Sequence, residues 1–412
     1  MNKTFINTKI LPEVRAISSK SEAHRALICA ALSDTPCFIE CNDTNADIDA
    51  TASCLCSLGA VIERRADGFA VTPISSITKN AVLDCNESGS TLRFLLPLAA
   101  SLGADCDFIM RGRLAQRPLS PLYELMAQNG VTLTPQGSNP LKIKGKLGSG
   151  NYSLAANVSS QYISGLLFAL CIADGDSTLS LCGKIESVPY IFMTVNTLMA
   201  FGADIKFDDS TNTFNIKGKS HLTAPARFTV GGDWSNAAFF LVAGAIGKWP
   251  VTVSELDRSS AQGDRAVLDV LCRMGARITF DGGITVHPST LHGTNVDASD
   301  IPDLVPILAV AASVAVGKTQ IYGAARLRLK ESDRIESVCA TLSALGAKIC
   351  ATEDGMIIEG SSALTGGDVD SYNDHRIAMS AAIASLVCTN AVTISRFEAI
   401  NKSYPSFLEN FE

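Results

Sequence analysis

The sequence predicts an α/β protein of two domains, each built from three copies of one repeat whose helices lie inside and whose sheets lie outside. Two series of regularly spaced segments carry this prediction. The length supports it, because a chain of 412 residues is too long for one compact core. With 47% hydrophobic and 18% charged residues, the composition is that of a folded protein rather than a disordered chain or a coiled coil.

The first series marks the ends of five helices. Each segment has an apolar-periodic stretch, then a glycine, then a strand-like run, as in LCRMGARITFD. Glycine suits the end of a helix because it enters the left-handed region at little cost. A polar turn and a second strand often follow, as in ITFDGGITVHP. The five glycines, 71 to 73 residues apart, are Gly59, Gly130, Gly202, Gly275 and Gly346.

The second series consists of six Ala- and Leu-rich segments that each begin with a polar cluster, such as SKSEAHRALICAAL and NDHRIAMSAAIASLV. They are apolar nearly all round, so we expect buried helices whose Ser, Asp and Asn starts serve as N-terminal caps. The six anchors, 68 to 75 residues apart, are Ser21, Ser90, Ser160, Ser235, Asp303 and Asn373. Together the two series predict six copies of a βαβαββ unit.

Six units in a chain of this length suggest two domains of three units each. We expect the chain to cross between the domains at residues 11–19 and again at residues 230–234. The first domain then comprises residues 19–231, and the second comprises residues 1–18 joined with 232–412.

The composition also limits the function. Lys and Arg total 34 against 41 Asp and Glu, a net charge of −7, whereas a general nucleic-acid or anionic-membrane binder needs surplus positive charge. No apolar run is a convincing membrane span, and the N-terminus lacks a signal-peptide pattern. Thirteen cysteines without a CxxC pair, together with only five histidines, favour the reducing cytosol over a metal site or a disulfide framework. We therefore expect a cytoplasmic protein without a metal.

Basic residues gather where the predicted helices begin. Helix N-termini offer free N–H groups and a partial positive charge, which attract phosphate and carboxylate. If the buried helices of each domain run parallel, six N-termini point into one cleft. An acidic protein with cations at these places indicates an enzyme for small polyanions. The cations at helix starts or nearby turns are Lys20, Arg25, Arg93, Arg117, Lys330, Arg334, Arg376 and Lys402.

An ordered set of motifs resembles the 5-enolpyruvylshikimate-3-phosphate synthase family. The motifs are SKSEAHRA, SGSTLR, QRPLSPL, SSQY, IPDL, LKESDR, NDHR and NKSYP, and they extend from Lys20 to Pro405. The resemblance implies two domains of three inside-out α/β units, which agrees with the repeats. It implies transfer of the enolpyruvyl group of phosphoenolpyruvate to the 5-hydroxyl of shikimate 3-phosphate, with release of phosphate. It also implies a place in the shikimate pathway, no metal or organic cofactor, a monomeric enzyme, and a phosphoenolpyruvate pocket that glyphosate occupies.

The resemblance further implies the binding residues. For phosphoenolpyruvate they are Lys20, Gly89, Arg117, Gln161, Arg334, Arg376 and Lys402. For shikimate 3-phosphate they are Lys20, Ser21, Arg25, Ser159, Ser160, Gln161, Ser187, Asp303 and Lys330. Both substrates are multiply negative, which suits the bidentate fork of Arg.

The reaction needs a base on the 5-hydroxyl as it adds to C2 and an acid that delivers a proton to C3. We assign Asp303 to the hydroxyl, and Lys20 and Glu331 to the proton transfers. A Lys surrounded by other cations loses its proton more easily, which suits this task.

Two positions depart from the family pattern. Glu87 in Glu87-Ser88-Gly89 stands where many members have an Asn, so a carboxylate lies beside the expected anion pocket. We expect it to pair with an Arg or to point away. Arg326 stands where some members have an Asn that contacts the substrate, and we do not assign it to the site.

Two alternatives remain. The sister enolpyruvyl transferase that acts on UDP-N-acetylglucosamine shares the fold but uses a Cys on a mobile loop. The corresponding stretch, residues 111–121, contains no Cys, and Cys106 lies upstream in a strand-like run. A non-catalytic anion-binding relative is the other alternative. Retention of Lys20, Asp303 and Glu331 argues against it, because binding alone does not require an acid–base set.

Overall fold

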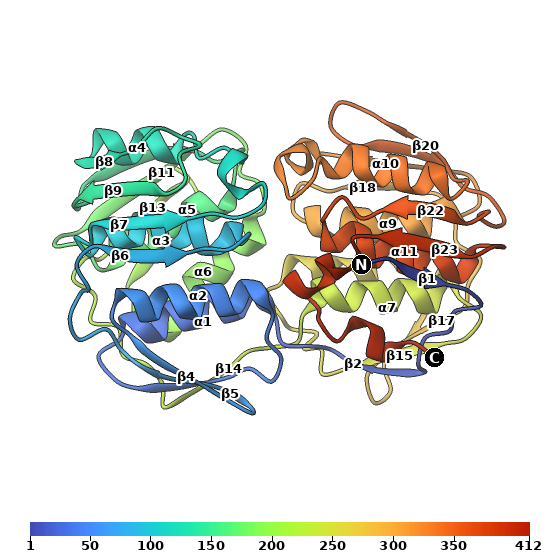
Figure 1. Cartoon of the computed structure of the whole chain (residues 1–412), viewed down its shortest axis with the longest axis horizontal. Helices are drawn as coiled ribbons and strands as arrows, with labels where there is room; N and C mark the ends of the chain where they lie inside the picture. Colours follow the sequence, from blue (N-terminus) through green and yellow to red (C-terminus); the bar gives the residue numbers. More distant parts are fainter. The chain divides into compact units, whose positions relative to one another are not determined.

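The computed structural model describes all residues from Met1 to Glu412, and the chain divides into two compact units. The first unit is Ser18–Val230. The second unit is Met1–Ile17 together with Gly231–Glu412. Mixed helices and sheets make up both units (Figure 1).

The first unit holds three four-stranded sheets with one common plan. In each sheet two parallel strands lie beside an antiparallel pair. The second repeat is β6 (Ala81–Asp84), α3 (Gly89–Ser101), β7 (Cys106–Ile109), α4 (Leu122–Gln128), β8 (Val131–Leu133) and β9 (Leu141–Gly145). The third is β10 (Asn151–Ala155), α5 (Ser160–Cys171), β11 (Ser177–Cys182), α6 (Val188–Ala200), β12 (Ile205–Asp208) and β13 (Thr213–Ile216). Both follow the predicted βαβαββ order.

The first repeat takes its leading strand from the far end of the unit. Its own elements are α1 (Lys20–Leu32), β3 (Cys37–Glu40), α2 (Ala46–Leu58), β4 (Val61–Arg65) and β5 (Gly68–Thr72). The strand β14 (Arg227–Thr229) pairs in parallel with β3 and occupies the position of the leading strand in the other sheets.

The second unit repeats the plan in its fourth and fifth repeats, whereas the sixth has a three-stranded sheet and no second α-helix, so the prediction of six full βαβαββ units was wrong for the last one. The fourth repeat is β2 (Glu13–Arg15), α7 (Trp234–Ile246), β15 (Val251–Ser254), α8 (Val267–Arg273), β16 (Arg277–Thr279) and β17 (Ile284–His287). The fifth is β18 (Asn295–Asp297), α9 (Val305–Ser313), β19 (Lys318–Tyr322), α10 (Arg334–Ala344), β20 (Lys348–Ala351) and β21 (Met356–Glu359). The sixth is β22 (Gly367–Asp370), α11 (His375–Ala384) and β23 (Val392–Ser395), and β1 (Lys3–Phe5) completes its sheet.

Short 3-10 helices lie in the connections. They are η1 (Leu114–Gln116), η2 (Gly263–Ala266), η3 (Pro302–Leu304), η4 (Ala325–Leu329), η5 (Ser385–Val387), η6 (Phe397–Lys402) and η7 (Phe407–Asn410). No helix in the chain combines the length and the apolar character needed to cross a bilayer.

The six Ala- and Leu-rich helices form the cores of the two units, as predicted. In the first unit α1, α3 and α5 are buried, and in the second unit α7, α9 and α11 are buried. In each unit of Figure 1 the strands lie outside these helices. The predicted fold class is therefore confirmed.

Close contact between α3 and α5 shows why small residues occur in these helices. Pro97 lacks an N–H group, so it cannot donate to the carbonyl of Arg93 one turn earlier. The α5 helix packs against this carbonyl through Gly165, where an added Cβ would overlap the Arg93 oxygen.

The five glycines of the first series follow α2, α4, α6, α8 and α10, and all five have the positive φ that the sequence predicted. The φ angles are +120° at Gly59, +90° at Gly130, +89° at Gly202, +92° at Gly275 and +94° at Gly346. An L side chain at these positions is strained.

Candidate functional site

Helix caps place the polar clusters of the first unit. Ser19 caps α1, Ser88 caps α3 and Ser159 caps α5, each accepting a hydrogen bond from a backbone N–H in the first turn. The caps therefore lie one or two residues before the repeat anchors Ser21, Ser90 and Ser160. The anchors are instead the first or second residues of their helices.

Lys20 is the first residue of α1 and forms an ion pair with Asp47. Its Nζ lies 2.9 Å from Asp47 Oδ2, and both side chains are more than four-fifths buried. Asp47 lies in the first turn of α2, whose cap is Asn45. Sequence reasoning missed Asp47, because a search for anion ligands passes over acids. The acid in the first turn of a capped helix was the available signal.

Arg25 is buried and connects α1 to α6. Its Nε donates to Thr194 Oγ1 at 2.8 Å, its Nη2 to the Tyr190 carbonyl at 2.9 Å and its Nη1 to the Ser21 carbonyl at 2.6 Å. Burial lowers the pKa of Arg25 to about 10, so the group still carries its charge at neutral pH. Ser187, the residue before α6, is also buried and has a φ of +54°.

Gly89, Arg117 and Gln161 meet around a fourth residue, Arg93. An added Cβ on Gly89 would lie 2.6 Å from Arg93 Nη1 and 2.8 Å from Arg117 Nη1. Arg93 Nη1 donates to Gln161 Oε1 at 3.4 Å, and Gln161 Nε2 donates to Ser90 Oγ at 3.0 Å. Three predicted ligands are thus brought together, with Arg93 as an additional cation that had no assigned role.

A buried chain of hydroxyls underlies this cluster. His24 Nδ1 lies 2.7 Å from Thr51 Oγ1, Thr51 Oγ1 lies 2.7 Å from Thr91 Oγ1, and Thr91 donates to Ser88 Oγ at 2.7 Å. Burial, with Lys20 nearby, holds the pKa of His24 well below its usual range, so this ring is neutral. The chain links α1, α2 and α3 near their N-terminal ends.

Glu87 is directed at the loop that carries Arg117. Its carboxylate packs against Gly112, where an added Cβ would overlap Glu87 Oε2. Gly112 has a φ of +54°, a backbone conformation that favours glycine.

Arg334 is the centre of the cluster in the second unit. It is the first residue of α10 and is 2% exposed. Its Nη1 lies 2.7 Å from Asp303 Oδ1, its Nη2 2.8 Å from Glu331 Oε2 and its Nε 2.8 Å from Asp374 Oδ2. The structure therefore brings Asp303, Glu331 and Arg334 together, as expected of parts of one site.

These carboxylates and cations shift each other's pKa. Burial alone would raise the pKa of Asp303, but Lys330, Arg376 and Arg334 together hold it well below its usual range. Burial likewise opposes the charge of Arg334, yet Asp374, Glu331 and Asp303 raise its pKa further above the ordinary value. Asp303 is thus ionised, with Lys330 Nζ at 3.9 Å and Arg376 Nη2 at 3.8 Å.

Two more predicted cations belong to the same unit. Arg376 lies in α11 and is buried, with Nη1 donating to the Ser235 carbonyl at 2.9 Å and Nη2 to Ser235 Oγ. Lys402, at the end of η6, donates from Nζ to the Asn373 carbonyl at 2.7 Å, next to the start of α11. Arg326 donates from Nη2 to the Ser299 carbonyl at 2.8 Å.

Asp374 is a functional candidate that sequence reasoning missed. It is completely buried, caps α11, and accepts from Arg376 N at 2.9 Å and Ser332 Oγ at 3.1 Å in addition to Arg334. It therefore pairs with the guanidinium of Arg334 and caps the helix at the backbone N–H of Arg376. The signal was its place in NDHR, between a polar turn and an apolar helix.

The two clusters can bind small polyanions by charge and by helix N-termini, and they contain carboxylates and a lysine suited to moving protons. No group of His, Cys, Asp and Glu side chains in the chain has a geometry suited to a metal ion.

Comparison with known proteins gives a consistent result. The family model described as EPSP synthase (3-phosphoshikimate 1-carboxyvinyltransferase) matches residues 6–411. The 3-phosphoshikimate 1-carboxyvinyltransferase of Clostridium novyi is 42% identical over 98% of this chain and 97% of its own length. That of Clostridium kluyveri is also 42% identical, over 98% and 95%.

Solved structures resemble the chain along its whole length. The EPSP synthase of Acinetobacter baumannii superposes with a TM-score of 0.80 at 26% identity, over 99% of this chain and 98% of that one. The enolpyruvyl transferase NikO of Streptomyces tendae has a TM-score of 0.77 at 20% identity, over 98% and 94%, and shows the fold alone. With a matching family model over almost every residue and close relatives of equal length, this chain belongs to the EPSP synthase (3-phosphoshikimate 1-carboxyvinyltransferase) family.

Proposed function

We propose that this protein transfers the enolpyruvyl group of phosphoenolpyruvate to the 5-hydroxyl of shikimate 3-phosphate, giving 5-enolpyruvylshikimate 3-phosphate and phosphate. Membership of the family across residues 6–411 is the observation that carries the proposal. The cations and acid–base candidates in the two clusters support it, because the substrates are both polyanions and the reaction moves protons.

We assign phosphoenolpyruvate to Lys20, Gly89, Arg117, Gln161, Arg334, Arg376 and Lys402. We assign shikimate 3-phosphate to Lys20, Ser21, Arg25, Ser159, Ser160, Gln161, Ser187, Asp303 and Lys330. Arg334 is already surrounded by carboxylates at 2.7–2.8 Å. An incoming anionic substrate group therefore takes over contacts that Asp303 and Glu331 make in its absence.

The roles of the acids follow from their surroundings. Asp303 has a pKa held low by three cations, so it is a weak base but a charged acceptor at neutral pH. We assign it to orient and polarise the 5-hydroxyl as its oxygen bonds to C2 of phosphoenolpyruvate. Lys20 and Glu331 then handle the protons: the 5-hydroxyl gives up its proton to one of them while a proton from the other is added to C3, forming a tetrahedral intermediate. A proton is later removed from C3 as the C2–O bond to phosphate breaks and phosphate leaves.

The cations of the proposed site come from both units. Lys20, Arg25 and Arg117 belong to the first unit, and Arg334, Arg376 and Lys402 belong to the second. We propose that bound polyanions draw the two units together and exclude water from the reacting groups. We further propose a monomeric enzyme of the reducing cytosol, where its thirteen free cysteines stay reduced.

Phosphate release tests the proposal. We expect release from phosphoenolpyruvate when shikimate 3-phosphate is present and none when UDP-N-acetylglucosamine replaces it. Burial raises the pKa of Cys106, the cysteine just before residues 111–121 in the sequence, to about 12, which disfavours the thiolate that a cysteine nucleophile for the second reaction needs. Release with the nucleotide sugar, or with neither acceptor, contradicts the proposed function.

A further inference from the structure

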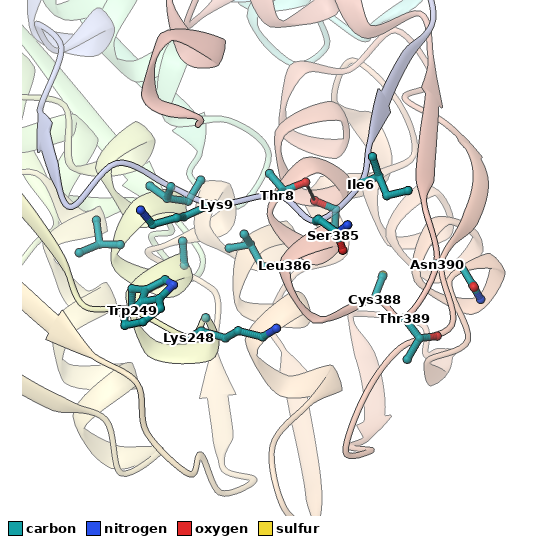
Figure 2. Close-up of a pocket in the computed structure, with 15 residues that line it drawn as sticks. Ile6, Thr8, Lys9, Lys248, Trp249, Ser385, Leu386, Cys388, Thr389 and Asn390 are labelled. Atoms are coloured by element: carbon teal, nitrogen blue, oxygen red, sulfur yellow. Dashed lines mark hydrogen bonds between the residues drawn. The ribbon is translucent and has the colours of Figure 1, made fainter.

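A cavity on the second unit lies among residues that the proposed reaction does not use. It has a volume of about 250 Å³ and is lined by three segments that are distant in sequence (Figure 2). These are residues 6–10, residues 247–249 and Val251 with Ala243 of α7, and residues 385–386 and 388–390 after α11. None of the residues assigned to substrates lines it.

The wall formed by residues 6–10 is held at both ends. β1 before it pairs with β23, and Ile10 after it bridges to Phe411, where Leu11 N also donates to the Asn410 carbonyl at 3.0 Å. Within the wall, Thr8 Oγ1 lies 3.2 Å from Ser385 Oγ of the opposite segment. This side of the cavity is therefore lined by backbone that is anchored at both ends.

Apolar side chains lie behind part of the cavity, and the rim carries one aromatic ring. Ile10, Ala243 and Val251 are only 5%, 1% and 2% exposed and therefore offer a ligand little surface, whereas Leu386 is partly exposed. Trp249, in contrast, is 60% exposed, so most of its indole surface is available at the edge of the cavity. An aromatic ring of a ligand gains from stacking on such a surface.

Two lysines line the cavity, and only Lys248 is not paired with a carboxylate. Lys9 Nζ already lies 2.5 Å from Glu412 Oε2, whereas Lys248 has no carboxylate within 4.0 Å. In Figure 2 the Lys248 side chain extends toward Cys388 and Thr389, with the Trp249 ring at the other end. No Asp or Glu is among the lining residues. One lysine beside neutral hydroxyls and an amide matches one negative charge.

From these contacts we infer that the cavity binds a small aromatic monocarboxylate, with its ring against Trp249 and its carboxylate on Lys248. The size agrees, because a cavity of about 150 Å³ holds benzene. The additional volume here leaves room for a short acid side arm. Thr389 and Asn390, at the far end, supply polar contacts for the carboxylate.

The two tryptophans allow a direct binding assay. Trp234 is completely buried, so Trp234→Phe leaves Trp249 as the sole tryptophan and as a reporter inside the proposed site. We expect phenylacetate to change its fluorescence along a saturable curve, with a dissociation constant on the order of 1 mM or tighter. Benzyl alcohol, benzylamine and inorganic phosphate should each bind at least about tenfold more weakly, since each lacks either the charge or the ring.

Variants test the charge. Lys248→Met should weaken phenylacetate binding about tenfold or more, and Lys248→Arg should restore most of it. Lys318→Met, an exposed lysine of the same unit outside the cavity, should change nothing. Equal affinity for benzylamine and phenylacetate, a non-saturable response, or an unchanged Lys248→Met variant overturns the inference. If Trp234→Phe does not fold, calorimetric titration of the wild type against Lys248→Met decides the same question without relying on turnover.

Discussion

Replacing Gly89 with Ala tests whether the Arg93–Arg117 cluster grips phosphoenolpyruvate. The new Cβ would lie 2.6 Å from one guanidinium nitrogen and 2.8 Å from the other, whereas ordinary contact begins at 3.4 Å. Both groups therefore have to move by roughly 0.5–1 Å, and misplacement on the order of 1 Å at a site costs up to about a hundredfold. We expect the KM for phosphoenolpyruvate to rise about ten- to hundredfold, or roughly 1.4–2.7 kcal/mol.

The fold should tolerate this change. Gly89 is the first residue of α3, and Ala is the better helix former by up to about 1 kcal/mol, so the free energy of unfolding should stay level or rise slightly. The KM for shikimate 3-phosphate should change much less, and glyphosate inhibition should weaken together with phosphoenolpyruvate binding.

Gly148→Ala is the matched control, because no atom lies within 4 Å of its added Cβ. The assay is steady-state phosphate release with each substrate varied in turn. Equal losses for both substrates, with glyphosate inhibition intact, would place Gly89 outside the phosphoenolpyruvate pocket.

Three other predictions follow from the same clusters. Lys20→Met should lower turnover more than about a hundredfold, or roughly 2.7 kcal/mol. Its circular dichroism spectrum should stay unchanged. Near-normal turnover would mean that the Lys20–Asp47 ion pair has a structural role only. Asp303 has a lowered pKa when folded, so its ion pairs stabilise the protein above about pH 4 and this stability is lost as the pH falls further. The Tm difference between wild type and Asp303→Asn should therefore shrink from pH 5 to pH 3, and a constant difference would contradict the ion-pair account. Shikimate 3-phosphate should change tryptophan fluorescence, mostly through Trp234, and with glyphosate it should reduce the radius of gyration measured by small-angle scattering. An unchanged radius at saturation rules out closure.

The fold was predictable because its repeats leave two independent traces in the sequence. A glycine with positive φ ends one helix in each of the first five repeats, and buried Ala-rich helices form the cores of both units. Both features are local and recur about every seventy residues. The first strands of the first and fourth repeats, β14 and β2, were harder to predict. Each is only three residues long and pairs with a strand distant in sequence.

The sequence predicted the basic residues of the site better than its acidic residues. Motifs supplied Arg334, Arg376 and Gln161. They did not supply Asp374, whose carboxylate pairs with Arg334, or Asp47, the partner of Lys20. These acids are needed because buried cations require compensation in a folded protein, a demand that depends on three-dimensional neighbours. Arg25 illustrates the same limit, because its hydrogen bonds to Thr194 and Tyr190 join α1 to α6, about 165 residues away in the chain.

The strands β1, β2 and β14 pair with strands distant in sequence, and this has a consequence for the order in which the chain folds during synthesis. The first unit is one continuous segment, Ser18–Val230, and every strand of its sheets is available once β14 has left the ribosome. Residues 1–17 are made earlier but must wait, because β2 pairs with β15 and β1 with β23, near the end of the chain. Asp233 N donates to the Ile17 carbonyl at 2.8 Å. Within the second unit, the residues that precede and follow the continuous segment Ser18–Val230 therefore lie next to each other. A shortened gene that joins residue 17 to residue 231 through a brief linker should therefore encode a second unit that folds by itself.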